Sequence, residues 1–203
     1  MEDSVKDIMV IRDPKTAKII ADDTRWKILS ILRYRAMTPS QLAIFLGKTV
    51  SSIMHHLRVL EEKGLVTLVR TEVKGNMIEK WYKATARKFI ISYELTEGRV
   101  PGSEETAKIT EDIARRAVKA LSAFGFEVGD EERLVELFRK FVSLRRAALE
   151  KIAGMQKRKV DADYAAYWLL LNVLTYIILF DSNEFHNLLM GIKRYLGGLD
   201  EFD

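Results

Sequence analysis

Cysteine is absent from this chain of 203 residues, which excludes disulfide bonds and thiolate metal sites. Amide side chains are also scarce: the chain has only Gln41, Gln156 and a few asparagines. Low amide content, no cysteine and 31% charged residues are typical of thermophilic proteins. We therefore expect a protein of thermophilic type.

The chain also lacks the short motifs that announce an enzyme. It has no glycine-rich phosphate loop, no serine nucleophile in a recognisable setting and no histidine–carboxylate metal motif. The N-terminal segment MEDSVKDIMVIRD is acidic and lacks the apolar run of a signal peptide. We predict a cytoplasmic protein that is not an enzyme and needs no cofactor or metal.

A helix, a tight turn and a second helix are predicted from Thr38 onward. Thr38 and Gln41 have the spacing of a capping box, and Pro39 suits the first helical position. Gly47 can adopt the left-handed conformation that ends a helix, and Thr49 can cap the next one. The predicted apolar positions are Leu42, Phe45 and Leu46 in the first helix, and Val50, Ile53, Leu57 and Leu60 in the second. This pattern is typical of a helix-turn-helix whose second helix, about residues 50–63, enters the DNA major groove.

Positive charge is concentrated in the same part of the chain. The net charge of the whole protein is +4, but Arg25 to Lys88 holds 13 Lys or Arg against four acids, a local balance of +9. Lysine and arginine on a solvated face would give such a count without any ligand. Because the charge coincides with a helix-turn-helix, we interpret it as a phosphate-binding surface.

A β-hairpin is predicted directly after the second helix, over about residues 65–84. The run LVTLVRT and the run IEKWYKAT have strand character, and Gly75-Asn76 lies between them as a turn. Its basic residues include Arg70, Lys74, Lys80 and Lys83. We expect this wing to lie along the phosphate backbone. The alternative is a plain ribbon that closes the small domain, and both can hold.

The chain becomes helical after a linker at about Glu97 to Ser103. We therefore predict two domains, residues 1–96 with the winged helix-turn-helix and residues 104–203 with helices only. The fold class is mainly α with a small β-hairpin. The most apolar helix, Tyr164 to Phe180, has seventeen residues without a charge.

Three interpretations of this apolar helix remain open. A buried core or a dimer seam is one, and an organic effector pocket along it is another. The pocket candidates are Tyr164, Tyr167, Trp168, Asn172 and Tyr176. A membrane span is the third, but no basic cluster flanks the helix and its polar residues dilute the apolarity, so we predict no membrane contact.

With these motifs placed, the chain resembles the ArsR-type winged helix-turn-helix regulators. The resemblance runs through DDTRWKIL from Asp22 to Leu29, SSIMHHLRVLEEKGLV and KWYKAT, and covers roughly residues 15–95. It is similar to an archaeal or thermophilic type with an added helical half. It implies a homodimer that binds a palindromic operator in double-stranded DNA and responds to an effector. Metal sensors of this family use cysteine pairs or acid and histidine ligands on a C-terminal helix, and this chain has neither, so any effector is expected to be organic.

The candidate DNA contacts lie on the second helix and the wing. They are Thr49, Ser51, Ser52, His55, His56, Arg58, Arg70, Lys74 and Lys80. Adjacent histidines on a helix point about 100° apart and do not easily share one metal ion, so we expect one to face DNA and the other to pack inward. The alternative function is a winged-helix adaptor that binds proteins and has no specific DNA site.

Overall fold

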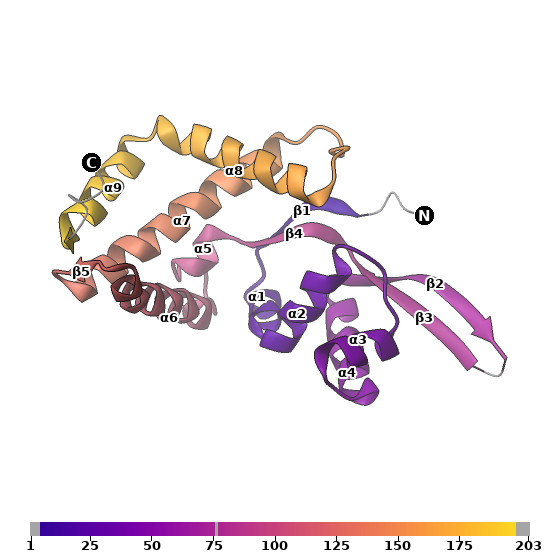
Figure 1. Cartoon of the computed structure of the whole chain (residues 1–203). Coiled ribbons are helices and arrows are strands. Elements are labelled where there is room, and N and C mark those ends of the chain that lie inside the picture. Colours follow the sequence, from indigo (N-terminus) through magenta and orange to yellow (C-terminus); the bar gives the residue numbers. More distant parts are fainter. Residues whose placement is uncertain (1–4, 76, 198–203) are drawn as a thin grey trace. The chain divides into compact units, whose positions relative to one another are not determined.

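The computed structural model describes residues 5–75 and 77–197 and divides the chain into two compact units. Unit 1 comprises residues up to Ile90 together with Lys157–Tyr164, and unit 2 comprises Ile91–Gln156 and the residues from Ala165 onward. The main chain therefore passes between the units three times. Each unit is described by itself, and Figure 1 labels α1 to α9 and β1 to β5.

Unit 1 contains the predicted winged helix-turn-helix. Its elements are α1 (Pro14–Ala21), α2 (Asp23–Leu32), α3 (Pro39–Leu46), α4 (Val50–Glu62), β2 (Val66–Lys74) and β3 (Met77–Ala84). Strands β2 and β3 pair antiparallel from Val66 opposite Ala84 outward, with an irregularity between Leu68 and Arg70. The fully buried side chains of this unit are mainly aliphatic: Ile28, Leu29, Leu32, Leu42, Ile53, Leu57, Leu60, Leu65 and Val66. The predicted fold class is confirmed.

A second two-stranded sheet of unit 1 was not predicted. Strand β1 (Lys6–Ile11) pairs with β4 (Ala86–Ile91), which follows the wing directly. The Lys6 N–H also donates to the Thr85 carbonyl at 2.9 Å. Sequence patterns missed β1 because it has only six residues and its partner strand begins about 80 residues further along the chain.

The segment from Lys157 to Tyr164 is held on this second sheet by a buried charge pair. The Asp7 carboxylate accepts from the Val160 N–H at 2.7 Å and lies 3.3 Å from the Arg87 guanidinium. Arg87 also donates to the carbonyls of Val160 and Ala162, at 3.2 and 2.6 Å. The Asp7 side chain is fully buried and the Arg87 side chain is 14% exposed. We call Asp7, Arg87 and the backbone of residues 160–162 the clamp.

Unit 2 is mainly helical and also contains two short strands, which were not predicted. Its elements are α5 (Tyr93–Thr96), α6 (Glu104–Ala120), a 3₁₀ turn (Leu121–Phe124), β5 (Glu127–Val128), α7 (Glu131–Met155), α8 (Tyr164–Phe180), α9 (Asn183–Tyr195) and β6 (Leu196–Gly197). The two short strands pair antiparallel. Its core joins four helices through Ala114, Val118, Leu134, Val135, Leu137, Ala148, Leu179, Phe185 and Leu188.

Helix α8 is buried on only one face. Tyr167, Leu171, Thr175 and Leu179, spaced four residues apart, are buried. The opposite face is apolar and exposed, and we call it the α8 stripe: Leu169, Val173, Tyr176, Ile177 and Phe180. Within this single chain, α8 is therefore not buried on all sides, as a core helix would be.

No single helix in the described ranges is long and apolar enough to cross a membrane. One bent pair, α8 with α9 at 96°, passes the same test by length and composition.

Candidate nucleic-acid interface

Helix α4 is positioned by its caps and by its apolar face. The Thr49 hydroxyl accepts from the Ser52 N–H at 3.2 Å and caps the helix N-terminus. Ile53, Leu57 and Leu60 are buried, as predicted, and fix the rotation of the helix in the unit. This rotation leaves one polar face in solvent.

The exposed face of α4 includes Ser51, His55 and Arg58, at spacings of four and three residues, and continues to the exposed Glu62 at the end of the helix. Each carries a hydrogen-bonding group that can meet a base edge or a phosphate. Ser52 is half-buried. Val50 was expected on the buried face, but its side chain is 46% exposed because it is the first residue of the helix and extends past the core.

Helix α3 begins and ends as predicted. The Gln41 N–H donates to the Thr38 hydroxyl at 3.2 Å, and the Thr38 N–H donates to the Gln41 side chain at 3.0 Å, which completes the capping box. Gly47 ends the helix with φ 62°. The prediction that Phe45 packs inward is wrong, because its side chain is 63% exposed and only Leu42 and Ala43 of this helix are buried.

The DDTR segment secures helix α2, which precedes the helix-turn-helix. The Asp22 carboxylate caps α2 by accepting from the Arg25 N–H at 2.9 Å. The Arg25 guanidinium donates to the Ile19 carbonyl at 2.6 Å, which ties α2 to α1. Trp26, on the same helix, is 44% exposed.

The two adjacent histidines point in different directions. Their ring centroids lie 5.6 Å apart with the ring planes at 67°. His55 is exposed, whereas His56 is half-buried with its Nδ1 3.9 Å from the Asp22 Oδ1. Burial lowers the pKa of His56 below its ordinary value of 6.5, and the Asp22 carboxylate offsets this only in part. His56 therefore packs against α2 as a neutral ring and leaves His55 as the accessible histidine of α4.

The wing presents basic residues in two different settings. The Arg70 guanidinium lies 4.1 Å from the centre of the Trp81 ring and forms an ion pair with Glu72 at 3.1 Å. Lys80 is exposed, opposite Thr71 in the hairpin. The side chain of Lys74 lies outside the described part of the structure. Arg70 is thus held against the strand, while Lys80 extends into solvent.

The aromatic residues proposed for an effector pocket do not share one surface. Tyr167 is 2% exposed, whereas Trp168 and Tyr176 are each about half exposed. Tyr164 packs on Tyr34 with ring centroids 4.7 Å apart. Asn172 donates to the Trp168 carbonyl at 2.8 Å and accepts from Arg145 at 3.5 Å. A cavity of about 520 Å³ in unit 2 has other lining residues, from α5, α7 and α9 and the α5–α6 loop.

Metal ligands do not gather in the parts of the chain that the structure describes. No group of three or more His, Asp or Glu side chains lies close enough there to hold an ion.

Comparison with known proteins supports the interpretation of unit 1. Residues 22–67 match the family model described as bacterial regulatory protein, arsR family. This segment is similar to an ArsR-type helix-turn-helix. The match begins at the α2 cap Asp22 and ends in β2, so it contains α2, α3 and α4 but excludes most of the wing and all of the helical unit.

The PadR protein of Bacillus subtilis in complex with operator DNA is similar at 15% sequence identity and a TM-score of 0.29, over 84% of this chain and 98% of that one. A likeness at that level supports no conclusion about this chain. A search of curated proteins gave no match.

Proposed function

We propose that the protein is a sequence-specific transcriptional regulator that binds double-stranded DNA as a homodimer. The observation that carries this proposal is the exposed face of α4, where Ser51, His55 and Arg58 face solvent on an ArsR-type helix-turn-helix. In this proposal residues 1–96 bind the DNA, and residues 104–203 form the dimer.

The α4 face supplies the chemistry for base recognition. An exposed hydroxyl, imidazole and guanidinium can form hydrogen bonds with base edges in the major groove, and arginine pairs well with guanine. His56 is turned toward Asp22, so we assign the histidine contact to His55 alone. Thr49 acts by capping α4, which directs the N-terminal turn of the helix toward the groove.

The wing supplies contacts to the phosphate backbone. Lys80 is exposed and carries a flexible charge, which suits contact with phosphates of any sequence. Arg70 is already paired with Glu72 and stacked on Trp81, so we assign it a smaller share of the affinity.

The α8 stripe supports the homodimer. Its five apolar residues are spaced at three and four positions over three turns, and no charged side chain interrupts the helix. Two of these five residues are large aromatics: Tyr176 is 48% exposed and Phe180 is 86% exposed. Exposed apolar surface of this kind marks an interaction site, and a second copy offers the same uncharged stripe in return. Two helix-turn-helix units in one dimer bind two half-sites about one DNA turn apart, roughly 34–36 Å.

The first experiment selects bound sequences from random duplexes and then compares variants on the selected site. Ser51→Ala and His55→Ala should reduce the preference for this site over random DNA by about 1–3 kcal/mol per lost base contact. Lys80→Gln should weaken binding to all sequences alike and reduce the dependence of affinity on salt. Lys27→Gln is the matched control, because this exposed lysine lies on α2 and is paired with Asp23 at 2.6 Å.

A protein-binding adaptor is the second candidate function, and a specific observation favours it. Ile44 and Phe45 on α3 are 85% and 63% exposed, which is unusual for apolar side chains of this size. An adaptor would show no preferred sequence and only a shallow salt dependence. If the selection from random duplexes yielded no preferred sequence, the adaptor function would be favoured over the regulator function.

A further inference from the structure

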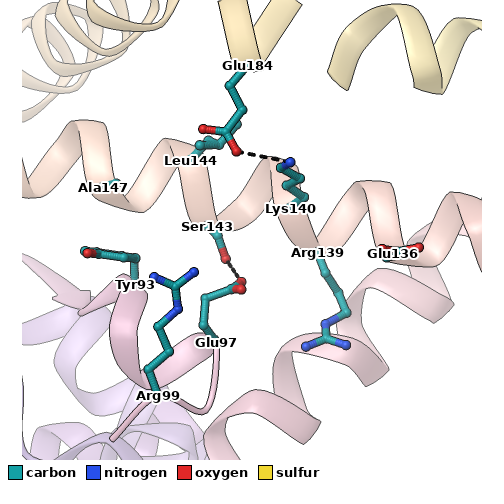
Figure 2. A pocket seen from close by; sticks show the side chains of 10 residues that line it. All are labelled: Tyr93, Glu97, Arg99, Glu136, Arg139, Lys140, Ser143, Leu144, Ala147 and Glu184. Carbon is teal, nitrogen blue, oxygen red and sulfur yellow. Dashed lines mark hydrogen bonds and ion pairs between the residues drawn. The ribbon is translucent and has the colours of Figure 1, made fainter. Parts of the chain in front are cut away.

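The cavity of unit 2 has the volume of a small-molecule site and a largely charged lining. Its volume of about 520 Å³ lies within the range of roughly 300–1,000 Å³ that is usual for ligand pockets. Its lining comes from three helices and the α5–α6 loop, all within unit 2: Tyr93, Glu97, Arg99, Glu136, Arg139, Lys140, Ser143, Leu144, Ala147 and Glu184. Figure 2 shows these side chains around the cavity.

Every carboxylate of the lining already has a partner. Glu97 accepts from the Ser143 hydroxyl, and Glu184 pairs with Lys140 at 3.0 Å, as the dashed lines in Figure 2 show. Glu136 pairs with Arg133 outside the cavity. The acidic side chains are therefore satisfied without a ligand.

The positively charged side chains of the lining differ in whether they form an ion pair. Arg139 pairs with Glu111 of α6 at 3.2 Å, and Lys140 with Glu184. Within the described ranges Arg99 has no ion pair, and its guanidinium carbon lies 5.9 Å from the centre of the Tyr93 ring. Its backbone N–H donates to the Glu94 carbonyl at 3.0 Å, which holds the loop that carries it. Arg99, an exposed side chain, is thus the lining cation that has no ion pair in the part of the chain that the structure describes.

We propose that this cavity binds a small organic carboxylate, with Arg99 as the group that receives the carboxylate. A guanidinium donates two parallel hydrogen bonds to a carboxylate, which a neutral analogue cannot accept as well. The Tyr93 ring, Leu144 and Ala147 provide apolar surface for the carbon body of the ligand. A single uncommitted cation suits one carboxylate better than a phosphate, which carries more charge.

The test measures ligand binding to the full-length protein without DNA, so its result is independent of the proposed function. Benzoate, phenylacetate and hexanoate are each titrated beside the corresponding neutral amide, with inorganic phosphate as a separate probe. At least one carboxylate should bind about tenfold or more tightly than its amide, the factor expected for a charge-assisted hydrogen bond. Binding is measured in two ways, by isothermal titration calorimetry and by shifts of the protein's backbone amide signals in NMR spectra.

Variants identify the residue responsible. Arg99→Gln should abolish the difference between acid and amide, and Arg99→Lys should restore only part of it, because an ammonium keeps the charge but not the two-pronged geometry. Arg116→Gln is the matched control, since Arg116 is an exposed arginine of α6 outside the cavity lining. Three results would overturn the proposal: no preference for any carboxylate, a preference that survives in Arg99→Gln, or phosphate bound more tightly than every carboxylate.

Discussion

The clamp in unit 1 offers the sharpest test of how residues 157–164 are held on the sheet of β1 and β4. Replacing Asp7 by Ala removes a fully buried carboxylate that accepts from the Val160 N–H and lies 3.3 Å from the Arg87 guanidinium. The Arg87 guanidinium, only 14% exposed, is then left without this counter-charge, although its bonds to the Val160 and Ala162 carbonyls remain. Removing one partner of a buried ion pair costs about 3–5 kcal/mol. Because Arg87 keeps its hydrogen bonds to backbone carbonyls, we expect a loss near the lower end, about 3 kcal/mol.

Graded variants separate the charge from the hydrogen bond. Asp7→Asn keeps an acceptor for the Val160 N–H and loses only the charge, so it should cost roughly half as much. Replacing Asp7 by Leu and Arg87 by Met in one double variant should cost less than the sum of the two single changes. The reason is that the double variant leaves no buried charge without its partner. The matched control is Asp23→Asn, which breaks the exposed ion pair with Lys27 and should cost at most about 1 kcal/mol.

Urea unfolding followed by circular dichroism measures these costs as shifts in the midpoint at unchanged slope. Limited proteolysis of the native protein provides a local readout, since cleavage within residues 157–163 should accelerate in Asp7→Ala and remain unchanged in Asp23→Asn. If Asp7→Ala lost no more free energy of unfolding than Asp23→Asn, the clamp would contribute nothing and the reasoning would be refuted.

Three further predictions follow from the described contacts. Thr38→Ala should lower the free energy of unfolding by about 1 kcal/mol because it removes the capping box of α3, whereas Ser40→Ala on the exposed side should change little in the same urea assay. His56 has a pKa lowered by burial, so the unfolded chain binds more protons, and stability should decline as the pH falls below about 6.5; His56→Gln should make this decline smaller in unfolding titrations at several pH values. Val173→Glu should place a charge in the α8 stripe and yield monomers by light scattering while circular dichroism still shows a folded protein, and a dimer that survives this change would exclude α8 as the seam.

Local chemistry determined where the helices of this protein begin and end. The capping threonines, Thr38 and Thr49, and the left-handed Gly47 act through contacts within a few residues, so they are readable from the sequence alone. The periodic spacing of apolar residues likewise predicted the buried face of α4 at Ile53, Leu57 and Leu60. The sequence by itself therefore determined the position of α4 along the chain and the polar face that this helix exposes.

Tertiary structure decided which apolar side chains are covered and which distant segments meet. Phe45, Val50 and Trp26 fit an apolar pattern, yet they are exposed because no other element of the described chain covers them. The Asp7 contact with Val160 joins residues 153 positions apart, and the cavity around Arg99 gathers residues from three helices and a loop. Such sites depend on packing between elements, which no local pattern records, so the clamp and the candidate carboxylate site were visible only in three dimensions.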